Sequence, residues 1–292
     1  MLPLESVPNF SEGRDRPTIA AIGDALARHA RLLDIHADED HNRSVFTIVG
    51  SAEEIVDALL AGTAVAMERI DLRRHEGVHP RIGAADVVPV VAIRPQDADR
   101  ARDTARIAAE RMGDELGLPV FLYAELADGR TPAFFRRGGP DELQRRIDDG
   151  ELAPDFGPTR LDPAVGGVIV GARRPLIAFN VNLAGRDVDA AKSIACAIRE
   201  RDGGFPGVRA LGLDLPRAGH AQISMNVEDW EASSLHAIVE AVEREAAERG
   251  VEVSGTELVG MMPAGAALAA AGQVLRIDGF AASRVLELQL LE

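Results

Sequence analysis

The chain has 292 residues, of which 46% are hydrophobic and 27% are charged, a composition typical of a soluble globular protein and too apolar for a disordered one. Its formal net charge of -15 repels nucleic-acid phosphates and anionic membrane surfaces, and the chain contains no basic tract that would offset this charge. We therefore expect neither nucleic-acid nor membrane partners. The length suits one large domain or two lobes, and we expect two.

The cysteine count and the composition of two segments indicate whether disulfides form and where in the cell the protein is expected. The single cysteine, Cys196, excludes an intramolecular disulfide, and its apolar helical neighbours Ile194 and Ile198 predict that it lies in the core. The segment MLPLESVPNF has no basic region followed by an apolar stretch, which predicts a cytoplasmic protein. Residues 258–275 carry no charge, but their Ala and Gly content and Pro263 favour a buried helix packed on a sheet over a membrane span.

In chain order, the first half alternates between strand and helix patterns. Strands are predicted at 4–10, 31–37, 43–50, 85–93 and 119–123. Helices are predicted at 16–30, 52–70 and 97–117. Pro17 suits a first helical turn, Ser51 suits an N-cap, and Gly117 suits a helix end. This half is therefore α/β.

Residues 150–167 are rich in proline and glycine, which excludes regular structure and marks a loop or a lobe boundary. Beyond them, strand residues are predicted within 165–183 and at 207–215, 221–227, 251–260 and 283–290, with helices at 187–201 and 233–250. The ferredoxin-like order β-α-β-β-α-β is clear in this half, and the first half begins in the same way. We expect an α/β protein of the α+β sandwich type, with two related lobes at 1–166 and 167–292. Each lobe is predicted to have a mixed or antiparallel sheet covered by helices.

HEGVH, at residues 75–79, matches the zinc signature H-E-x-x-H. That signature requires a continuous helix, whereas Gly77 and Pro80 disfavour one, and no third ligand with suitable spacing follows. We therefore predict a loop and no metal, and the zinc hydrolase stays the weakest alternative.

Histidine and arginine gather where predicted strands end. The group consists of His36, His41, His75, His79, Arg43, Arg73, Arg74 and Arg81. Guanidinium groups hold carboxylates in a bidentate manner, and imidazole exchanges protons near neutral pH, so the group indicates an acid-base site for an anion. The alternative is that the arginines are surface partners of the surplus acidic residues.

Several segments then resemble a known family. They are VPNFSEGRD, LLDIHADEDHNRSVFTIVG, IDLRRHEGVHPRIGAADVVPVV, LAPDFGPTRLDPAVGGVIVGAR, LIAFNVNL, AQISMNVEDWEASSLHAIVEAVEREA and SGTELVGMMP. In this order they closely resemble glutamate formiminotransferase, a folate enzyme family of histidine degradation. The similarity covers nearly the whole chain, and VPNFSEG and RHEGVHPRIGA are highly specific.

The resemblance implies transfer of a formimino group between N-formiminoglutamate and tetrahydrofolate, with tetrahydrofolate as co-substrate, in a two-lobed protein that forms a homodimer. It assigns the catalytic histidine to His79. It also implies that folate lies in a cleft between the lobes. The folate loop falls on Gly157, Pro158, Thr159, Arg160, Leu161, Asp162, Pro163, Ala164, Val165 and Gly166.

The reaction that the resemblance implies is consistent with a catalytic histidine. Moving a formimino carbon between two amines needs a group that accepts and returns a proton, and imidazole can do this. Candidates for the glutamate carboxylates are Arg43, Arg74 and Arg81, and for the folate tail Arg160, Arg173 or Arg174. Asn180 and Asn182 alternate along a predicted strand, share one of its faces and suggest a wall of the cleft.

Two other functions stay open from the sequence. One is transfer of a formyl group between 5-formyltetrahydrofolate and glutamate, because a formyl oxygen would fit where the imino nitrogen does. The other is a folate-binding protein without catalysis, which His79 argues against because storage needs no proton transfer. The sequence has His36 where the animal members of the family have an acid, which puts a helper acid at that strand end in doubt.

Overall fold

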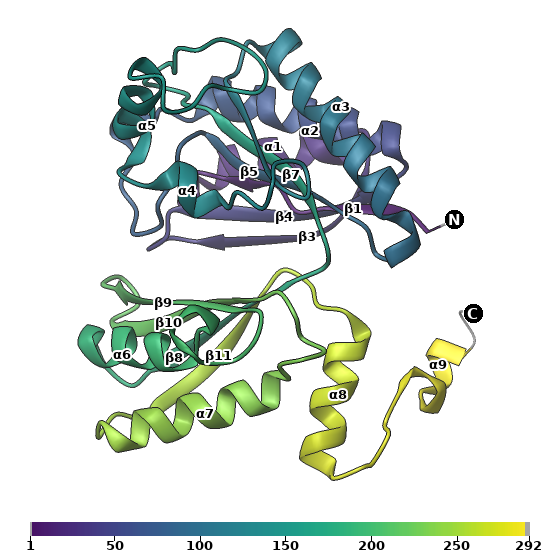
Figure 1. Cartoon of the computed structure of the whole chain (residues 1–292), viewed down its shortest axis with the longest axis vertical. Helices are drawn as coiled ribbons and strands as arrows, with labels where there is room; N and C mark the ends of the chain where they lie inside the picture. Colours follow the sequence, from purple (N-terminus) through teal and green to yellow (C-terminus); the bar gives the residue numbers. More distant parts are fainter. Residues whose placement is uncertain (1, 290–292) are drawn as a thin grey trace. The chain divides into compact units, whose positions relative to one another are not determined.

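The computed structural model describes residues 2–289 and divides into two compact units, Met1–Arg174 and Pro175–Glu292 (Figure 1). The boundary therefore follows Arg174, whereas the sequence placed it after Gly166. The physical reason is β7 (Val168–Arg173), which pairs in parallel with β5 (Ala85–Val91) and β6 (Val120–Ala124) and so belongs to the first sheet.

Within the first unit, strands form one mixed sheet in the order β1-β4-β2-β5-β7-β6, with β3 paired to β4. The remaining strands are β1 (Leu4–Ser6), β2 (Asn9–Phe10), β3 (Arg31–Asp38) and β4 (Arg43–Gly50). The predicted strand at 4–10 is thus two short strands. All pairings among β1 to β5 are antiparallel, and β5, β7 and β6 run parallel.

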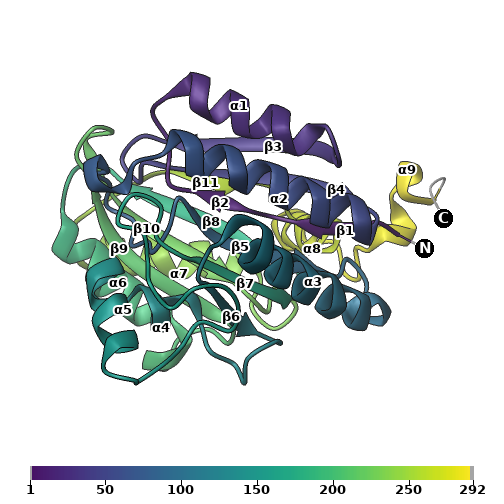
Figure 2. The same ribbon diagram turned by 90° about the horizontal axis from the view of Figure 1, so that it is seen from above.

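Helices α1 (Arg16–Ala27), α2 (Ala52–Arg69) and α3 (Ala98–Leu116) cover one face of this sheet, as the view from above shows (Figure 2). Ser51 and Glu54 form a capping box at the start of α2, and Gly117 ends α3 in the left-handed region with φ 65°. Both signals were predicted. The short helices η1 (Leu72–Arg74) and η2 (Pro95–Asp97) lie in the connections.

The opposite face of the sheet carries α4 (Pro132–Arg136) and α5 (Gly139–Asp148), which the sequence analysis did not predict. Phe135 and Leu143 from these helices are fully buried against Phe121 of β6 and Ile82. This second, smaller core holds α4 and α5 over β5, β6 and β7, next to the loop that carries HEGVH.

The second unit has the predicted β-α-β-β-α-β order. It consists of β8 (Ile177–Leu183), α6 (Val188–Ile198), β9 (Val208–Leu215), β10 (His220–Val227), α7 (Leu235–Glu248) and β11 (Val253–Val259), with η3 (Glu200–Asp202) after α6. The strands form an antiparallel sheet in the order β11-β8-β10-β9. In the first unit, β5, β1 with β2, β4 and β3 have the same arrangement, which confirms two related lobes.

Three predictions for the second unit were wrong. Cys196 is exposed, because a residue two positions from Ile194 and Ile198 points to the other side of α6. Helix α8 (Ala264–Leu275) is not buried on a sheet, since its buried residues are Ala266 and Gly272 alone. The predicted last strand consists, as far as residue 289, of η4 (Ala282–Arg284) and α9 (Leu286–Gln289), and residue 290 lies outside the described part.

Within residues 2–289, no helix is long and apolar enough to cross a membrane.

Candidate functional site

The H-E-x-x-H segment is a loop. Helix η1 ends before it, and the backbone of His75 is extended, with φ -86° and ψ 126°. Without a helix, the spacing does not direct His75 and His79 to one metal ion. In the described part of the chain, no group of three His, Cys, Asp or Glu side chains is placed to hold an ion. His75 instead donates from Nε2 to the carbonyl oxygen of Asn42 at 3.0 Å.

The imidazole of His79 is surrounded by cationic groups. Nη1 of Arg43 lies 3.1 Å from Nδ1 of His79 and also contacts its Nε2. A guanidinium group only donates, so the imidazole accepts this bond with an unprotonated nitrogen. Burial and the charges of Arg43 and Arg136 lower the pKa of His79 well below its ordinary value, and His41 and Arg81 act in the same direction. His79 is therefore neutral near pH 7 and can accept a proton.

Arg43, the first residue of β4, is a partly buried cation with an unused hydrogen-bond donor. Its Nη2 donates to Oδ1 of Asn9 on β2, and its Nη1 donates to His79, but its Nε is buried without a partner. Burial, together with the charge of Arg136, lowers its pKa to about 9. Among the described residues, no Asp or Glu forms an ion pair with Arg43. An anionic ligand would supply the missing charge.

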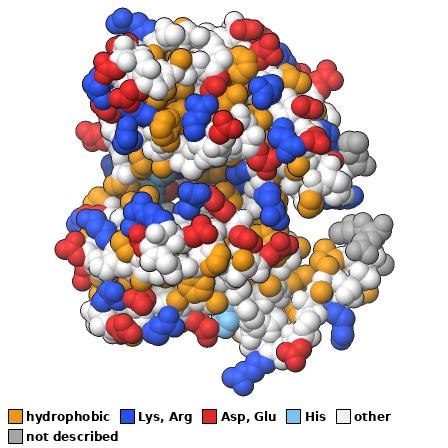
Figure 3. Space-filling view, viewed as in Figure 1, with side chains coloured by type: hydrophobic (Ala, Val, Ile, Leu, Met, Phe, Trp, Pro, Cys, Tyr) orange, Lys and Arg blue, Asp and Glu red, His pale blue; other side chains and the backbone are white. Residues whose placement is uncertain are grey.

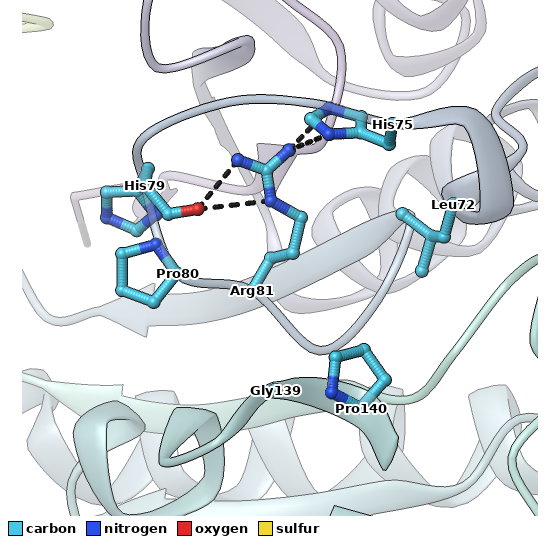
Figure 4. Close-up of a pocket in the computed structure, with 7 residues that line it drawn as sticks. All are labelled: Leu72, His75, His79, Pro80, Arg81, Gly139 and Pro140. Carbon is cyan, nitrogen blue, oxygen red and sulfur yellow. Dashed lines mark hydrogen bonds between the residues drawn. The ribbon is translucent and has the colours of Figure 1, made fainter. Parts of the chain in front are cut away.

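Arg81 ties the HEGVH loop to the turn between β3 and β4. Its Nη2 donates to the carbonyl oxygens of His41 at 3.0 Å and His79 at 2.6 Å, and its Nε donates to that of His79 at 3.1 Å. Its Nη1 contacts the ring of His75. Figure 4 shows the guanidinium group between His75 and the backbone of His79. All three nitrogens of Arg81 are engaged with the protein, so it positions the loop.

A buried ion pair that the sequence analysis missed lies beside this cluster. Asp86 on β5 is 2% exposed, accepts from the backbone N–H of Ile82 at 2.8 Å and pairs with Arg136 of α4. It joins α4 to the end of the loop, and Arg136 adds positive charge near His79. The signal in the sequence was the acid in the apolar run ADVVPVV, because a charge inside a buried strand needs a partner.

The cluster opens into a pocket of about 270 Å³. It is lined by Leu72, His75, His79, Pro80, Arg81, Gly139 and Pro140. Figure 4 places Gly139 and Pro140, at the start of α5, across the pocket from His79 and Arg81. The pocket thus combines an unprotonated imidazole with an apolar wall.

The predicted folate loop, residues 157–166, lies at the edge of this pocket. The N–H of Leu72 donates to the carbonyl oxygen of Ala164 at 2.8 Å, and the N–H of Ala84 donates to that of Val165 at 2.8 Å. Gly166 has φ 76°, and a Cβ atom there would lie 2.0 Å from the carbonyl oxygen of Ile82. Only glycine allows the backbone to approach so closely, which explains the glycine at this position.

The structure brings Arg43, His79 and Arg81 together but leaves Arg74 out. The side chain of Arg74 is 88% exposed, and Asp71 lies 3.9 Å from it. For Arg73 and Arg74 the surface interpretation therefore fits better. Figure 3 likewise shows blue and red side chains interspersed over the visible surface, as expected for exposed arginines paired with surplus acids.

Asn180 and Asn182 lie on β8 of the second unit and share one face, as predicted. Asn180 donates to Oε2 of Glu257 on β11 at 3.0 Å, and Asn182 accepts from Gln222 on β10 at 2.9 Å. Gln222 and Glu257 were not predicted as site residues, although their polar side chains alternate with apolar ones along their strands. The predicted roles of Asn180 and Asn182, and the predicted folate cleft, stay predictions.

Comparisons with known proteins agree with the resemblance in the sequence. Residues 3–173 match the model of the formiminotransferase domain, N-terminal subdomain, and residues 178–282 match that of the formiminotransferase domain. A glutamate formimidoyltransferase of Thermoplasma acidophilum is 40% identical, over 97% of this chain and 96% of the relative. One of Streptococcus pyogenes serotype M1 is 38% identical, over 95% and 94%.

A longer relative matches over part of its length. The formimidoyltransferase-cyclodeaminase of Sus scrofa is 40% identical over 92% of this chain, but the match covers 51% of that relative. The two family models together span most of both units of the present structure. The chain therefore belongs to the formiminotransferase domain family.

Proposed function

We propose that this enzyme transfers a formimino group between N-formiminoglutamate and tetrahydrofolate, with His79 as the general base. The observation that carries the proposal is the neutral imidazole of His79 in the wall of the pocket. Membership of the family supports it, since the relatives that match nearly end to end are named glutamate formimidoyltransferase.

His79 acts where the first new bond forms. The lone pair of the attacking folate amine forms a C–N bond to the formimino carbon, the π electrons of the C=N bond move to the imino nitrogen, and the proton of the attacking amine passes to His79. The tetrahedral intermediate then collapses. The lone pair of the imino nitrogen re-forms the C=N bond, the bond between carbon and the glutamate nitrogen breaks, and the glutamate nitrogen keeps that electron pair and takes up a proton. General acid-base catalysis of this kind is typically worth ~100 to 10,000-fold in rate.

Arg43 is the arginine that we assign to a carboxylate of the glutamate derivative. It has a buried N–H without a partner and no acidic partner among the described residues, whereas the nitrogens of Arg81 are engaged and Arg74 is exposed. A carboxylate beside Arg43 would also offset the positive charge around His79. Binding of the substrate would thereby make His79, the proposed base, a stronger base.

We assign the folate to the loop 157–166. This loop meets the pocket through the hydrogen bond between Leu72 and Ala164, so a ligand held by it would lie near His79. Homodimer formation and a cytoplasmic location stay predictions from the sequence.

A transfer assay with purified protein tests this function. The protein is incubated with tetrahydrofolate and either N-formiminoglutamate or N-formylglutamate, samples are acidified, and the methenyl-folate absorbance is read. We expect a strong signal with the formimino donor. A signal mainly with the formyl donor would favour formyl transfer instead. Folate binding without a signal from either donor would leave a folate-binding protein.

A further inference from the structure

A second histidine lies beside His79, in the turn between β3 and β4. Its imidazole is paired with a carboxylate: Nδ1 of His41 lies 2.8 Å from Oδ1 of Asp38, and the same oxygen accepts the backbone N–H of His41 at 2.6 Å. The two residues are three apart in a turn that Asn42 closes with φ 46°. The local backbone therefore fixes the pair.

The carboxylate determines which nitrogen of His41 carries the proton. An ionised carboxylate only accepts, so Nδ1 of His41 must donate. Burial opposes the charge of Asp38, but its hydrogen bonds with His41 outweigh burial and hold the pKa of Asp38 below its ordinary value. Within residues 2–289, Nε2 of His41 has no hydrogen-bond partner, and it is not among the fully buried unpartnered atoms. Nε2 is thus the open end of an oriented imidazole.

The two imidazoles lie close together in contrasting surroundings. The ring centroids of His41 and His79 are 6.2 Å apart, at an interplanar angle of 48°. Arg43 from β4 donates to His79, whereas Asp38 from β3 accepts from His41. Arg81 contacts only the backbone carbonyl of His41. Burial and neighbouring cations therefore keep the imidazole of His79 unprotonated, whereas the imidazole of His41 is held by a carboxylate.

We propose that His41, oriented by Asp38, is a second catalytic residue, the general acid that protonates the leaving nitrogen while His79 accepts the proton of the attacking amine. The inference rests on the proposed function and deepens it. Two groups placed in opposite environments divide the two proton transfers, as occurs in other acid-base sites.

The protons and electrons balance in this scheme. His79 starts neutral and gains the proton of the folate amine as the new C–N bond forms. His41, held through Nδ1 by Asp38, gives a proton from Nε2 to the glutamate nitrogen as the old C–N bond breaks. One proton then returns from His79 to His41 through solvent, and both residues are restored.

Substitution of the pair separates this role from a purely structural one. We compare kcat and KM across pH for the wild type, His41→Gln and Asp38→Asn, with His29→Gln as control because His29 is exposed at the end of α1. We expect His41→Gln to lower kcat by at least ~100-fold with KM unchanged. Asp38→Asn should lower kcat in the same way, and the control should not.

Chemical rescue gives a second readout. Added imidazole should restore part of the activity of His41→Gly, because it can occupy the vacated space and donate a proton. A folded His41→Gln variant with wild-type kcat, or a loss of activity that imidazole does not rescue in folded His41→Gly, would overturn the inference alone. Absence of transfer by the wild type would instead reject the proposed function, and the inference with it.

Discussion

Arg43 and Arg81 both lie next to histidine motifs in the sequence, but at the scale of single residues they differ. Arg81 directs its nitrogens to backbone carbonyls and His75, whereas Arg43 contacts the imidazole of His79 and keeps one buried N–H without a partner. The sequence identified the group but could not separate the two roles, because these depend on contacts between segments far apart in the chain.

Replacing Arg43 with glutamine should change the pH dependence of catalysis. Burial is the largest cause of the lowered pKa of His79, and the charge of Arg43 is the second largest. Burial remains in the variant but the Arg43 charge is lost, so the pKa of His79 should rise toward its ordinary value. Because the neutral imidazole is active, the acidic fall of kcat/KM should move to higher pH, and KM for the formimino donor should increase. The pH profile of kcat/KM measures the first change, and saturation curves for the formimino donor measure KM. Arg73→Gln is the matched control, since Arg73 is exposed and bound to Asp71. An unchanged profile would show that Arg43 does not tune His79.

At the scale of elements, the site depends on how loops are fixed to strands. Periodicity predicted the strands and the helices α1, α2, α3, α6 and α7, because each buries one regular face. Helices α4 and α5 were missed because α4 is short and α5 is rich in charge around its few buried residues. The alternating apolar residues near Leu286 resembled a strand but have no sheet partner within the described residues. The pocket wall and the Asp86–Arg136 pair arise from those missed helices.

Replacing Arg81 with alanine should loosen the loop without removing a substrate contact. Loss of the bonds to the carbonyl oxygens of His41 and His79 should speed amide hydrogen exchange at 40–43 and 75–81. Because His79 would be less well placed, kcat should fall at least ~100-fold, and KM should stay near its normal value. Arg74→Ala is the control. An increase in KM alone, without faster exchange, would show that Arg81 binds substrate.

At the scale of the whole molecule, an acidic protein gathers partly buried positive charge around His79. The net charge is -15, but the group around His79 has Arg43, Arg81 and Arg136, and the buried carboxylate of Asp86 pairs with Arg136. Such a group of positive charges favours the binding of an anion but does not stabilise the folded state. Partly buried histidines account for part of this cost to folding, because their pKa is lowered in the folded state and they take up protons less readily there than in the unfolded chain.

This cost should appear as a loss of stability in acid. Burial and the charge of Arg81 lower the pKa of His75 to about 4, and the pKa of His79 is also lowered. In the unfolded chain both protonate near pH ~6.5, so the unfolded state binds more protons as the pH falls, and stability declines between about 6.5 and about 4. Urea unfolding at about pH 7 and about pH 5 should show a smaller loss in His75→Gln than in the wild type. If the wild type, His75→Gln and the exposed-site control His29→Gln all lose the same stability between these two pH values, the contribution assigned to His75 is contradicted.

The measurement that tests the central claim most directly is the turnover of His79→Ala with tetrahydrofolate and N-formiminoglutamate. The variant lacks the unprotonated imidazole but keeps the loop bonds of Arg81, so it should fold and bind folate normally. We predict that kcat falls by at least ~100-fold while the melting temperature and the folate affinity remain those of the wild type. Wild-type turnover by the folded variant would contradict the account, because the formimino group would then move without His79.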